Sequence, residues 1–247
     1  MDANLAAHIV FQRYFSKVSH RFINPPLGSF SRHLVLSDAD VALKKIIVAY
    51  DIPQFEKIRD EFNALSLTLN ERYKNTNLEY PLEFATEASS SYFLYSLVRI
   101  LRPLNIVETG VANGHSSYFL LNAILNNECG TLHSFDVKNN VGTLIAESEK
   151  KMWDLNILPR RRRKRFLEDT MKKLGNMDIF IHDSNHFYYW QIFEYRTAWK
   201  VLQNGGLLLS DDADASYAFL DFSREIQTSP TFISDRRKMF GIIKKSH

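Results

Sequence analysis

The fold of this chain is decided by one stretch, Ile106-Val107-Glu108-Thr109-Gly110-Val111-Ala112-Asn113-Gly114-His115-Ser116-Ser117. An apolar strand is expected to end at Glu108. Gly110 lets the chain turn sharply away from that strand, and Gly114 lets the backbone approach a ligand closely. Ser116 or Ser117 can cap the helix that is expected to follow. This succession of strand, glycine turn and helix is typical of a nucleotide-type cofactor site.

The acid in this stretch indicates which cofactor the turn favours. The dinucleotide fingerprint G-x-G-x-x-G is not matched, because Glu108 occupies the position of its first glycine. A carboxylate there would repel a pyrophosphate, but it would attract a ligand that carries an ammonium and a sulfonium. We therefore expect S-adenosylmethionine as the cofactor, with Glu108, Gly110, Gly114 and Ser116 among the residues that bind it.

Two further strand ends are expected to complete the cofactor site. The segment Thr131–Asp136 is a predicted strand that ends in an acid, and a carboxylate there can accept hydrogen bonds from both ribose hydroxyls. A third short strand is expected at Arg165–Leu167, which would bring Asp169 to the same edge of the sheet. We therefore predict that Asp136 binds the ribose and that Asp169 accepts from the adenine amino group.

With these residues the chain resembles the class I S-adenosylmethionine-dependent methyltransferases. Their motif of an acid, any residue, a glycine, three residues and a glycine is matched from Glu108 to Gly114. The resemblance implies an α/β fold with a Rossmann-like, mostly parallel sheet. The β-prone runs Thr231–Ser234 and Met239–Ile243 resemble the terminal hairpin of these enzymes, which would insert the last strand antiparallel.

The chain is expected to divide into two parts. We assign residues 86–247 to the methyltransferase domain and residues 1–85 to a helical N-terminal extension. The extension would cover the catalytic domain as a lid, contribute to a homodimer, or pack against the edge of the sheet. These three alternatives stay open at the level of sequence.

Carboxylates follow two further predicted strands, Met177–Asp183 and Gly206–Asp212. Ligands of open α/β sheets collect at the carboxyl ends of the strands, so Asp183, Asp211 and Asp212 are expected to lie together. Three carboxylates would repel one another unless a cation neutralised them, and oxygen ligands suit Mg²⁺, or Mn²⁺ and Ca²⁺ as substitutes. Asp183 is also expected to contact the cofactor.

The segment after the first of these acids narrows the resemblance. Asp183-Ser184-Asn185-His186-Phe187-Tyr188 looks like the D-G-x-H-x-Y signature of methyltransferase family 24. That family includes metal-dependent sugar O-methyltransferases of macrolide and aminocoumarin tailoring, and it is related to the catechol O-methyltransferases. The resemblance implies that Asp183 and the pair Asp211 and Asp212 hold the metal and that His186 is a base. Ser184 departs from the usual glycine, and Asn185 stands where some members carry a second acid.

The predicted function is metal-dependent O-methyl transfer to a hydroxyl of a small molecule, which by resemblance is a sugar or polyol. A histidine has an unperturbed pKa of about 6.5, which suits His186 to accept the hydroxyl proton near neutrality. Two alternatives stay open. One is an RNA-modifying methyltransferase that uses the basic run Arg160–Arg165, and the other is a cofactor-binding protein without catalysis. The acidic strand ends are also similar to those of cephalosporin hydroxylase-like proteins.

The composition agrees with one α/β domain plus an appendage, because 45% of the 247 residues are hydrophobic and 24% are charged. Cys129 is the only cysteine, which excludes an intrachain disulfide. The first residues lack a basic segment that leads into an apolar signal region, and no run of apolar residues is long enough for a membrane span. We expect a cytoplasmic protein that does not enter a membrane. The net charge of +3 is too small to indicate a class of binding partner.

Overall fold

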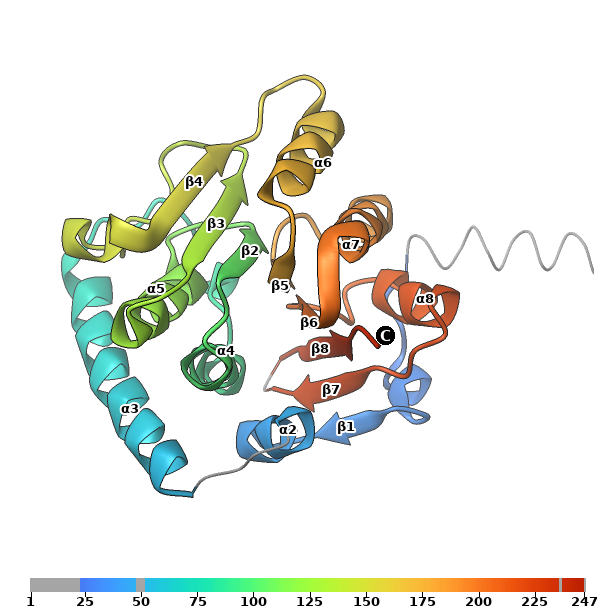
Figure 1. The fold of residues 1–247 in the computed structure, drawn as a ribbon, viewed down its shortest axis with the longest axis horizontal. Coiled ribbons are helices and arrows are strands. Elements are labelled where there is room, and N and C mark those ends of the chain that lie inside the picture. The colour runs from blue at the N-terminus through green and yellow to red at the C-terminus, as the bar shows by residue number, and fades with distance from the viewer. Residues whose placement is uncertain (1–22, 48–51, 236, 247) are drawn as a thin grey trace, which may run out of the picture.

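The computed structural model describes residues 23–47, 52–235 and 237–246. Within these residues, one sheet of eight strands lies between two layers of helices, in the order β1-β7-β8-β6-β5-β2-β3-β4 (Figure 1). This is the predicted Rossmann-like methyltransferase sheet. The first 22 residues of the predicted extension lie outside the described part of the chain.

The part of the sheet from β6 to the edge strand β4 consists of parallel strands. They are β2 (Asn105–Thr109), β3 (Thr131–Asp136), β4 (Trp153–Ile157), β5 (Met177–His182) and β6 (Leu202–Ser210). The inner strands are apolar on both faces because helices cover both sides. In β5, for example, Ile179 and Ile181 pack into one hydrophobic cluster while Phe180 packs into the other. The predicted strand at Thr131–Asp136 is confirmed with both of its bounds.

The C-terminal hairpin consists of β7 (Thr231–Ser234) and β8 (Met239–Lys244). The last strand, β8, lies between β7 and β6 and is antiparallel to both, as the resemblance implied. Its register pairs Gly241 with Ser210, the last residue of β6. The turn that precedes β8 therefore lies beside the residues that follow β6.

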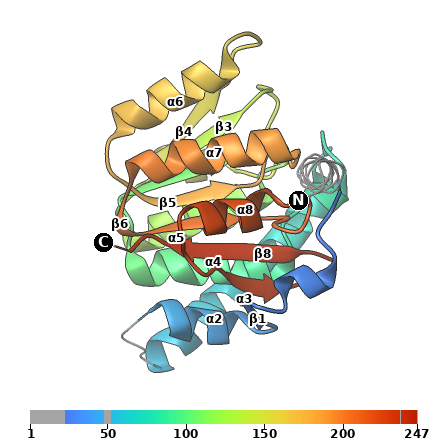
Figure 2. The ribbon, with the colours of Figure 1, turned by 90° about the vertical axis from the view of Figure 1, so that its right-hand side faces the viewer.

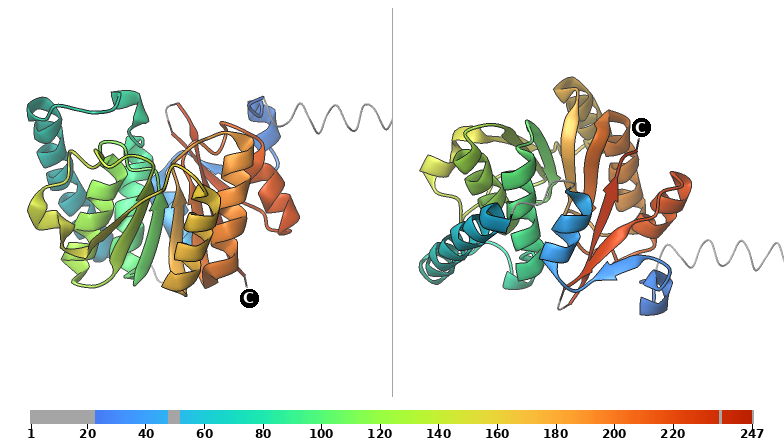
Figure 3. Two further views of the ribbon diagram at one scale, coloured as in Figure 1. Left: turned by 90° about the horizontal axis from the view of Figure 1, so that it is seen from above. Right: turned by 60° about the horizontal axis from the view of Figure 1, so that its bottom comes forward.

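Helices form a layer on each face of the sheet (Figures 2 and 3). One layer contains α2 (Ala39–Ile46), α3 (Ile52–Asn75), α4 (Ala88–Leu101) and α5 (His115–Asn127). The other contains α6 (Arg163–Leu174), α7 (Tyr188–Val201) and α8 (Ala218–Glu225), which lie side by side in Figure 2. Short 3-10 helices are η1 (Leu27–Phe30), η2 (Leu82–Phe84) and η3 (Glu147–Met152).

The extension is not wholly helical. Its short strand β1 (Leu34–Leu36) pairs in parallel with β7, with Leu34 opposite Thr231. Without β1, the outer backbone groups of β7 would form an open edge of the sheet, and unpaired edges are unfavourable. Its helices α2 and α3 contribute buried residues to the hydrophobic cluster that α4 and α5 share. The described part of the N-terminal extension therefore adds a strand to the sheet and helices to one of its faces.

The third strand of the cofactor site is misplaced in the sequence-based prediction. Residues Arg165–Leu167 lie in α6, and the strand beside β3 is β4. In α6 the buried residues Leu167 and Met171 are four positions apart, which is helical spacing. In β4, an edge strand, apolar and polar residues alternate as Trp-Asp-Leu-Asn-Ile, and its residues are half-buried or exposed. Because most residues of α6 are charged, the helical spacing of its few apolar residues is hard to recognise in the sequence.

Candidate active site

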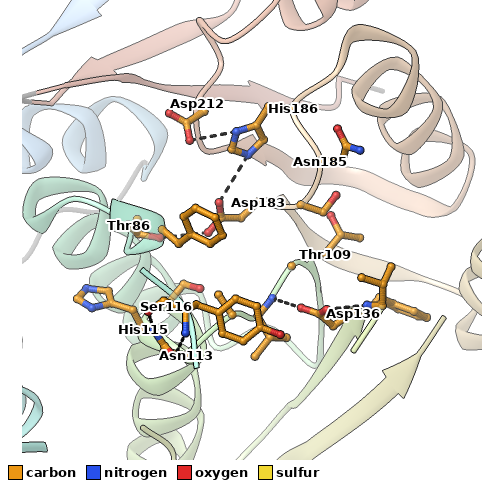
Figure 4. Close-up of a pocket in the computed structure, with 18 of the residues that line it drawn as sticks. Thr86, Thr109, Asn113, His115, Ser116, Asp136, Asp183, Asn185, His186 and Asp212 are labelled. Atoms are coloured by element: carbon orange, nitrogen blue, oxygen red, sulfur yellow. Dashed lines mark hydrogen bonds and ion pairs between the residues drawn. The ribbon is translucent and has the colours of Figure 1, made fainter. Parts of the chain in front are cut away.

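A cavity of about 590 Å³ opens at the carboxyl ends of β2, β3, β5 and β6. Its walls come from the loop between β2 and α5, the loop between β5 and α7, and the segment around η2 (Figure 4). Among the predicted site residues, those that line it are Gly110, Ser116, Asp136, Asp183, His186 and Asp212. Glu108, Gly114, Asp169 and Asp211 do not line it.

The glycine loop is fixed by close packing. Gly110 has a φ of 86°, and a Cβ atom on it would lie 2.0 Å from the carbonyl oxygen of Asp183. Gly114 is the N-cap of α5 with a φ of 89°, and a Cβ there would meet Ile145 at 2.9 Å. The two glycines therefore allow different contacts. Gly110 lets the loops after β2 and β5 approach each other, whereas Gly114 packs against the loop that follows β3.

Glu108 is fully buried and stabilises the loop from behind. Its Oε1 accepts hydrogen bonds from Ser117 Oγ at 2.5 Å and Ser134 Oγ at 2.6 Å, and Ser116 Oγ donates to Oε2 at 3.5 Å. The predicted side-chain cap is therefore absent, because these hydroxyls point to Glu108 and the N-cap is Gly114. Burial raises the pKa of Glu108 to about 7, although the hydroxyl donors lower it.

Asp136, which was predicted to bind the ribose, is the last residue of β3. Its Oδ2 accepts from the Val111 amide at 2.9 Å, and its Oδ1 accepts from the amides of Val137 and Lys138 at 2.6 and 3.1 Å. The side chain thus joins the loop after β2 to the loop after β3 (Figure 4). It also remains in the cavity wall, where a carboxylate oxygen can accept a further hydrogen bond from a hydroxyl.

Asp169 does not reach the cavity. It lies on α6, its side chain is 53% exposed, and its Oδ2 is 3.5 Å from Arg165 Nε. The adenine prediction for this residue followed from the misplaced third strand. The cavity wall near the end of β4 is instead formed by Leu158, with Arg163 and Trp190 from the neighbouring helices.

Residues of the extension complete the cavity. Tyr73, at the end of α3, and the segment around η2 line it. The side chain of Asn113 holds this segment, since its Oδ1 accepts from the amides of Glu79 and Tyr80 at 3.1 Å and its Nδ2 donates to the Tyr80 carbonyl at 2.8 Å. His115 lies between Tyr73 and Ser91, bonded at 2.8 and 3.1 Å, and burial lowers its pKa to about 4.

The acidic end of the cavity contains Asp183, His186 and Asp212, whose ligand atoms lie within 4.8 Å of one another. His186 Nδ1 is 3.2 Å from Asp212 Oδ2, and His186 Nε2 is 3.8 Å from Asp183 Oδ1 (Figure 4). Burial lowers the pKa of His186 to about 4, so the imidazole is neutral near pH 7. Burial and the neighbouring Asp211 raise the pKa of Asp183 well above its usual range.

Asp211 is not part of this group. Its carboxylate is buried and its Oδ2 is 2.7 Å from the Nζ of Lys238, which is also 3.1 Å from Asp212 Oδ2. Burial raises the pKa of Asp211 to about 6, although Lys238 lowers it. The predicted set of three aspartates therefore does not converge on one point. Asp183, His186 and Asp212 have donor atoms suited to a divalent ion, but the Lys238 ammonium already contacts one of those carboxylates.

Sequence reasoning missed Lys238, although one signal was present. The residue directly precedes the predicted last strand, and an antiparallel insertion of that strand brings its first residues to the ends of the parallel strands. The backbone contacts show this, since Met239 O accepts from the Ala213 amide at 2.8 Å and the Met239 amide donates to Asp214 Oδ1 at 3.0 Å.

A second buried network was also missed. Glu194 of α7 accepts from Thr109 Oγ1 at 2.6 Å, and its Oε2 lies 2.5 Å from His182 Nδ1. Ser184 Oγ donates to the Glu194 carboxylate at 3.0 Å. The serine that departs from the family's glycine is therefore used to fix the loop between β5 and α7.

The basic run is divided between a loop and a helix. Arg160 to Arg162 precede α6, which begins at Arg163, and the run is exposed. Arg163 lines the cavity, whereas Arg165 is paired with Asp169 on the surface. Over the described residues, none of the helices has the length and apolar character that crossing a membrane requires.

Comparison with known families agrees with this geometry. Residues 107–213 match the model of methyltransferase family 24, which is described as a methyltransferase domain. These residues are a class I methyltransferase domain that depends on S-adenosylmethionine. The match spans the glycine loop, Asp136 and the acidic strand ends. No curated protein matches the chain.

Solved methyltransferase structures share the fold. An O-methyltransferase from Bacillus cereus in complex with SAH has a TM-score of 0.52 and 15% identity, over 84% of this chain and 96% of that chain. SAH-bound PaMTH1 from Podospora anserina has a TM-score of 0.55 and 13% identity, over 81% and 99%. The O-methyltransferase TomG from Streptomyces achromogenes in complex with SAM has a TM-score of 0.54 and 15% identity, over 85% and 97%.

Proposed function

We propose that this methyltransferase transfers the methyl group of S-adenosylmethionine to a hydroxyl oxygen of a small molecule. The observation that carries the proposal is the position of His186, which lines the same cavity as the glycine loop. Within the described part of the chain, one ring nitrogen of His186 has no hydrogen-bond partner and can accept a proton. The structural relatives from Bacillus cereus and Streptomyces achromogenes are O-methyltransferases, which supports oxygen as the acceptor atom.

The cofactor end of the cavity suits a nucleoside with a cationic tail. Asp136 offers an acceptor for the ribose, and Leu158 and Trp190 offer apolar surface for a base. Gly110 and Asp183 belong to adjoining loops, which would place the sulfonium between the cofactor end and His186. The roof around η2 would exclude water from the reacting atoms.

The hydrogen bonds of His186 indicate which of its nitrogens acts. The Nδ1 position lies at hydrogen-bond distance from Asp212, and a carboxylate there favours the tautomer with hydrogen on Nδ1. In the described residues Nε2 has no hydrogen-bond partner. In the proposed reaction the acceptor oxygen forms a bond to the methyl carbon as the sulfur–methyl bond breaks. The hydroxyl proton moves to His186 Nε2, and the sulfonium becomes a neutral thioether.

The acceptor class is the finer part of the proposal. We propose a sugar or another polyol, which rests on the resemblance of residues 183–188 to the family 24 signature. Polar side chains at this end of the cavity support it, because Thr86, Asn185 and Asp212 can bond to several hydroxyls of one acceptor.

The resemblance also implies a divalent cation, Mg²⁺ being the predicted one. Asp183, His186 and Asp212 would hold it, and it would lower the pKa of the acceptor hydroxyl. This requirement stays a prediction. Lys238 already contacts Asp212, so the donor set does not fit a divalent ion while the lysine remains in place, and the proposed proton transfer does not depend on one.

The test follows a labelled methyl group. The protein is incubated with S-adenosylmethionine that carries an isotopic label on the methyl, together with a panel of sugars, polyols and phenols and, separately, total RNA. We expect the label in an O-methyl ether of a small molecule. Label in RNA would support the function that uses Arg160–Arg165 instead. Calorimetry that detects no binding of S-adenosylmethionine would contradict the proposal as a whole.

A further inference from the structure

Lys238 is brought to the acid cluster by the fold of the C-terminal hairpin. Because β8 is inserted antiparallel beside β6, the residue before β8 lies next to the aspartates that follow β6. The turn is anchored to the start of α4, since Asp235 Oδ2 accepts from the amide and the hydroxyl of Ser90 at 3.0 and 3.2 Å. Arg237 is also paired with Glu87. Lys238 therefore has a defined position.

The environment of Lys238 is unusual for a lysine. Its side chain is only 8% exposed, whereas lysine is among the residues least often buried. The ammonium lies 2.7 Å from Asp211 Oδ2 and 3.1 Å from Asp212 Oδ2. Two carboxylates at hydrogen-bond distance favour the charged form of the lysine. The ammonium keeps its charge inside the protein.

A divalent ion would compete with this ammonium. Bound to Asp212, such an ion would lie about 2.1 to 2.5 Å from a carboxylate oxygen. That carboxylate already accepts from Lys238 at 3.1 Å. Two cations in contact with one carboxylate repel each other, and the repulsion is strong because the site is buried. Asp211, the predicted third ligand, is also bound to the lysine.

We propose that the Lys238 ammonium is the resident cation of the acid cluster and stands in for the divalent ion of related enzymes, so that methyl transfer does not require added metal. This rests on the proposed function. Lys238 would act as a positioning residue: it neutralises Asp211 and holds the carboxylate of Asp212, which in turn orients His186.

A purely structural ion pair is the competing explanation. Buried ion pairs often contribute little to stability, and removal of one partner leaves an unpaired charge. Loss of stability in a Lys238 variant would therefore fit both explanations. Binding of a metal ion separates them, because only a cluster that has lost its own cation gains affinity for another.

The experiment measures binding of Mn²⁺ alone, by electron paramagnetic resonance and calorimetry, to the purified full chain. The variants are Lys238→Met, the double variant Lys238→Met with Asp212→Asn, and, as the matched control, Lys244→Met at the exposed end of β8. We expect wild type and Lys244→Met to bind no Mn²⁺ at the cluster. Lys238→Met should bind one ion, with an affinity at least about tenfold above the detection limit set by wild type, and the double variant should lose that binding.

Lys238→Arg provides a second measurement in case the methionine variant does not fold. It keeps the positive charge, so we expect it to bind Mn²⁺ no better than wild type. Tight one-to-one binding of Mn²⁺ by wild type, at a site lost in Asp212→Asn, would overturn the proposal. So would EDTA-sensitive turnover of wild type. Binding of S-adenosylmethionine is measured in parallel, because its loss would contradict the proposed function and not the role of Lys238.

Discussion

The two ends of the cavity are built in different ways. At the cofactor end, a single carboxylate, Asp136, holds backbone amides of two loops, the loop after β2 and the loop after β3. At the acceptor end, Asp183, Asp212 and Lys238 come from three separate segments and interact through side-chain charge. The cofactor end therefore depends on backbone geometry, whereas the acceptor end depends on long-range electrostatics.

This difference indicates where changes in chemistry can occur. A backbone cradle tolerates few substitutions, because a new Cβ atom displaces neighbouring backbone. A cluster of side chains can exchange one cation for another without a change of fold. The same sheet can thus support related reactions with different requirements for metal.

The largest effect is expected from Gly110→Ala, which adds a Cβ atom 2.0 Å from the Asp183 carbonyl oxygen. The loops after β2 and β5 would have to separate, so we expect loss of S-adenosylmethionine binding and at least about 3 kcal/mol of the free energy of unfolding. Calorimetry and denaturant titration measure the two quantities.

Gly175→Ala is the matched control for this substitution. Gly175 also has a positive φ, 74°, but nothing lies within 4 Å of the added Cβ atom. It should cost about 1 to 2 kcal/mol from backbone strain and leave cofactor binding intact. Equal effects of the two substitutions would mean that Gly110 is needed because of its backbone conformation and not because the two loops approach each other there.

The next effect concerns the acceptor end. His186→Ala should reduce turnover by about 10²- to 10⁴-fold, because it removes the group that accepts the hydroxyl proton. Affinity for S-adenosylmethionine should stay within about twofold of wild type. Burial lowers the pKa of His186 to about 4, so the base is already neutral at higher pH. Turnover should therefore not fall, through this group, between about pH 8 and pH 6. If turnover is unchanged in His186→Ala, His186 is not the group that accepts the hydroxyl proton.

Sequence was sufficient for the glycine loop and for the strand that ends at Asp136, because the signals there are local. Apolar runs, Gly110 and the acid at the end of β3 lie close together in the chain, and the strand at Thr131–Asp136 has the predicted bounds. Of the three aspartates expected together at the ends of parallel strands, Asp183 and Asp212 lie together with His186, but Asp211 does not join them.

The failures arose from weak or distant signals. The edge strand β4 is short and half-exposed, so the basic helix α6 was taken for a strand and Asp169 for a ligand. The pairing of β1 with β7 joins distant parts of the chain. Lys238 reaches Asp211 only through the register of β8, which no local pattern determines.

A smaller effect is expected from Glu108→Gln. Burial raises the pKa of Glu108 from 4.5 to about 7. The folded protein therefore holds the Glu108 proton more tightly than the unfolded chain does, and this contribution to the free energy of unfolding is full below about pH 4.5 and is lost as the pH rises to about 7. Glutamine stays neutral. Between about pH 5 and pH 8, the variant should therefore gain stability relative to wild type, by up to about 3 kcal/mol in the free energy of unfolding.

Denaturant titrations at several pH values measure this gain, with the exposed Glu147→Gln as a control that should show none. Glu108 does not line the cavity, so affinity for S-adenosylmethionine should change little. A large loss of affinity would instead support the hypothesis from the sequence that Glu108 attracts the cofactor directly.

The smallest effect is expected from Asp169→Asn, which tests the border of the cofactor end. The side chain is 53% exposed on α6 and is paired only weakly with Arg165, so its removal should leave both cofactor affinity and turnover unchanged. Asp136→Asn is the matched comparison, because it replaces a carboxylate that lines the cavity and holds three backbone amides. Calorimetric titration with S-adenosylmethionine should show weakened binding for Asp136→Asn alone. Weakened binding in Asp169→Asn would mean that Asp169 reaches the cofactor in solution, so that α6 would contribute more to the cofactor end than Arg163, the residue of this helix that lines the cavity.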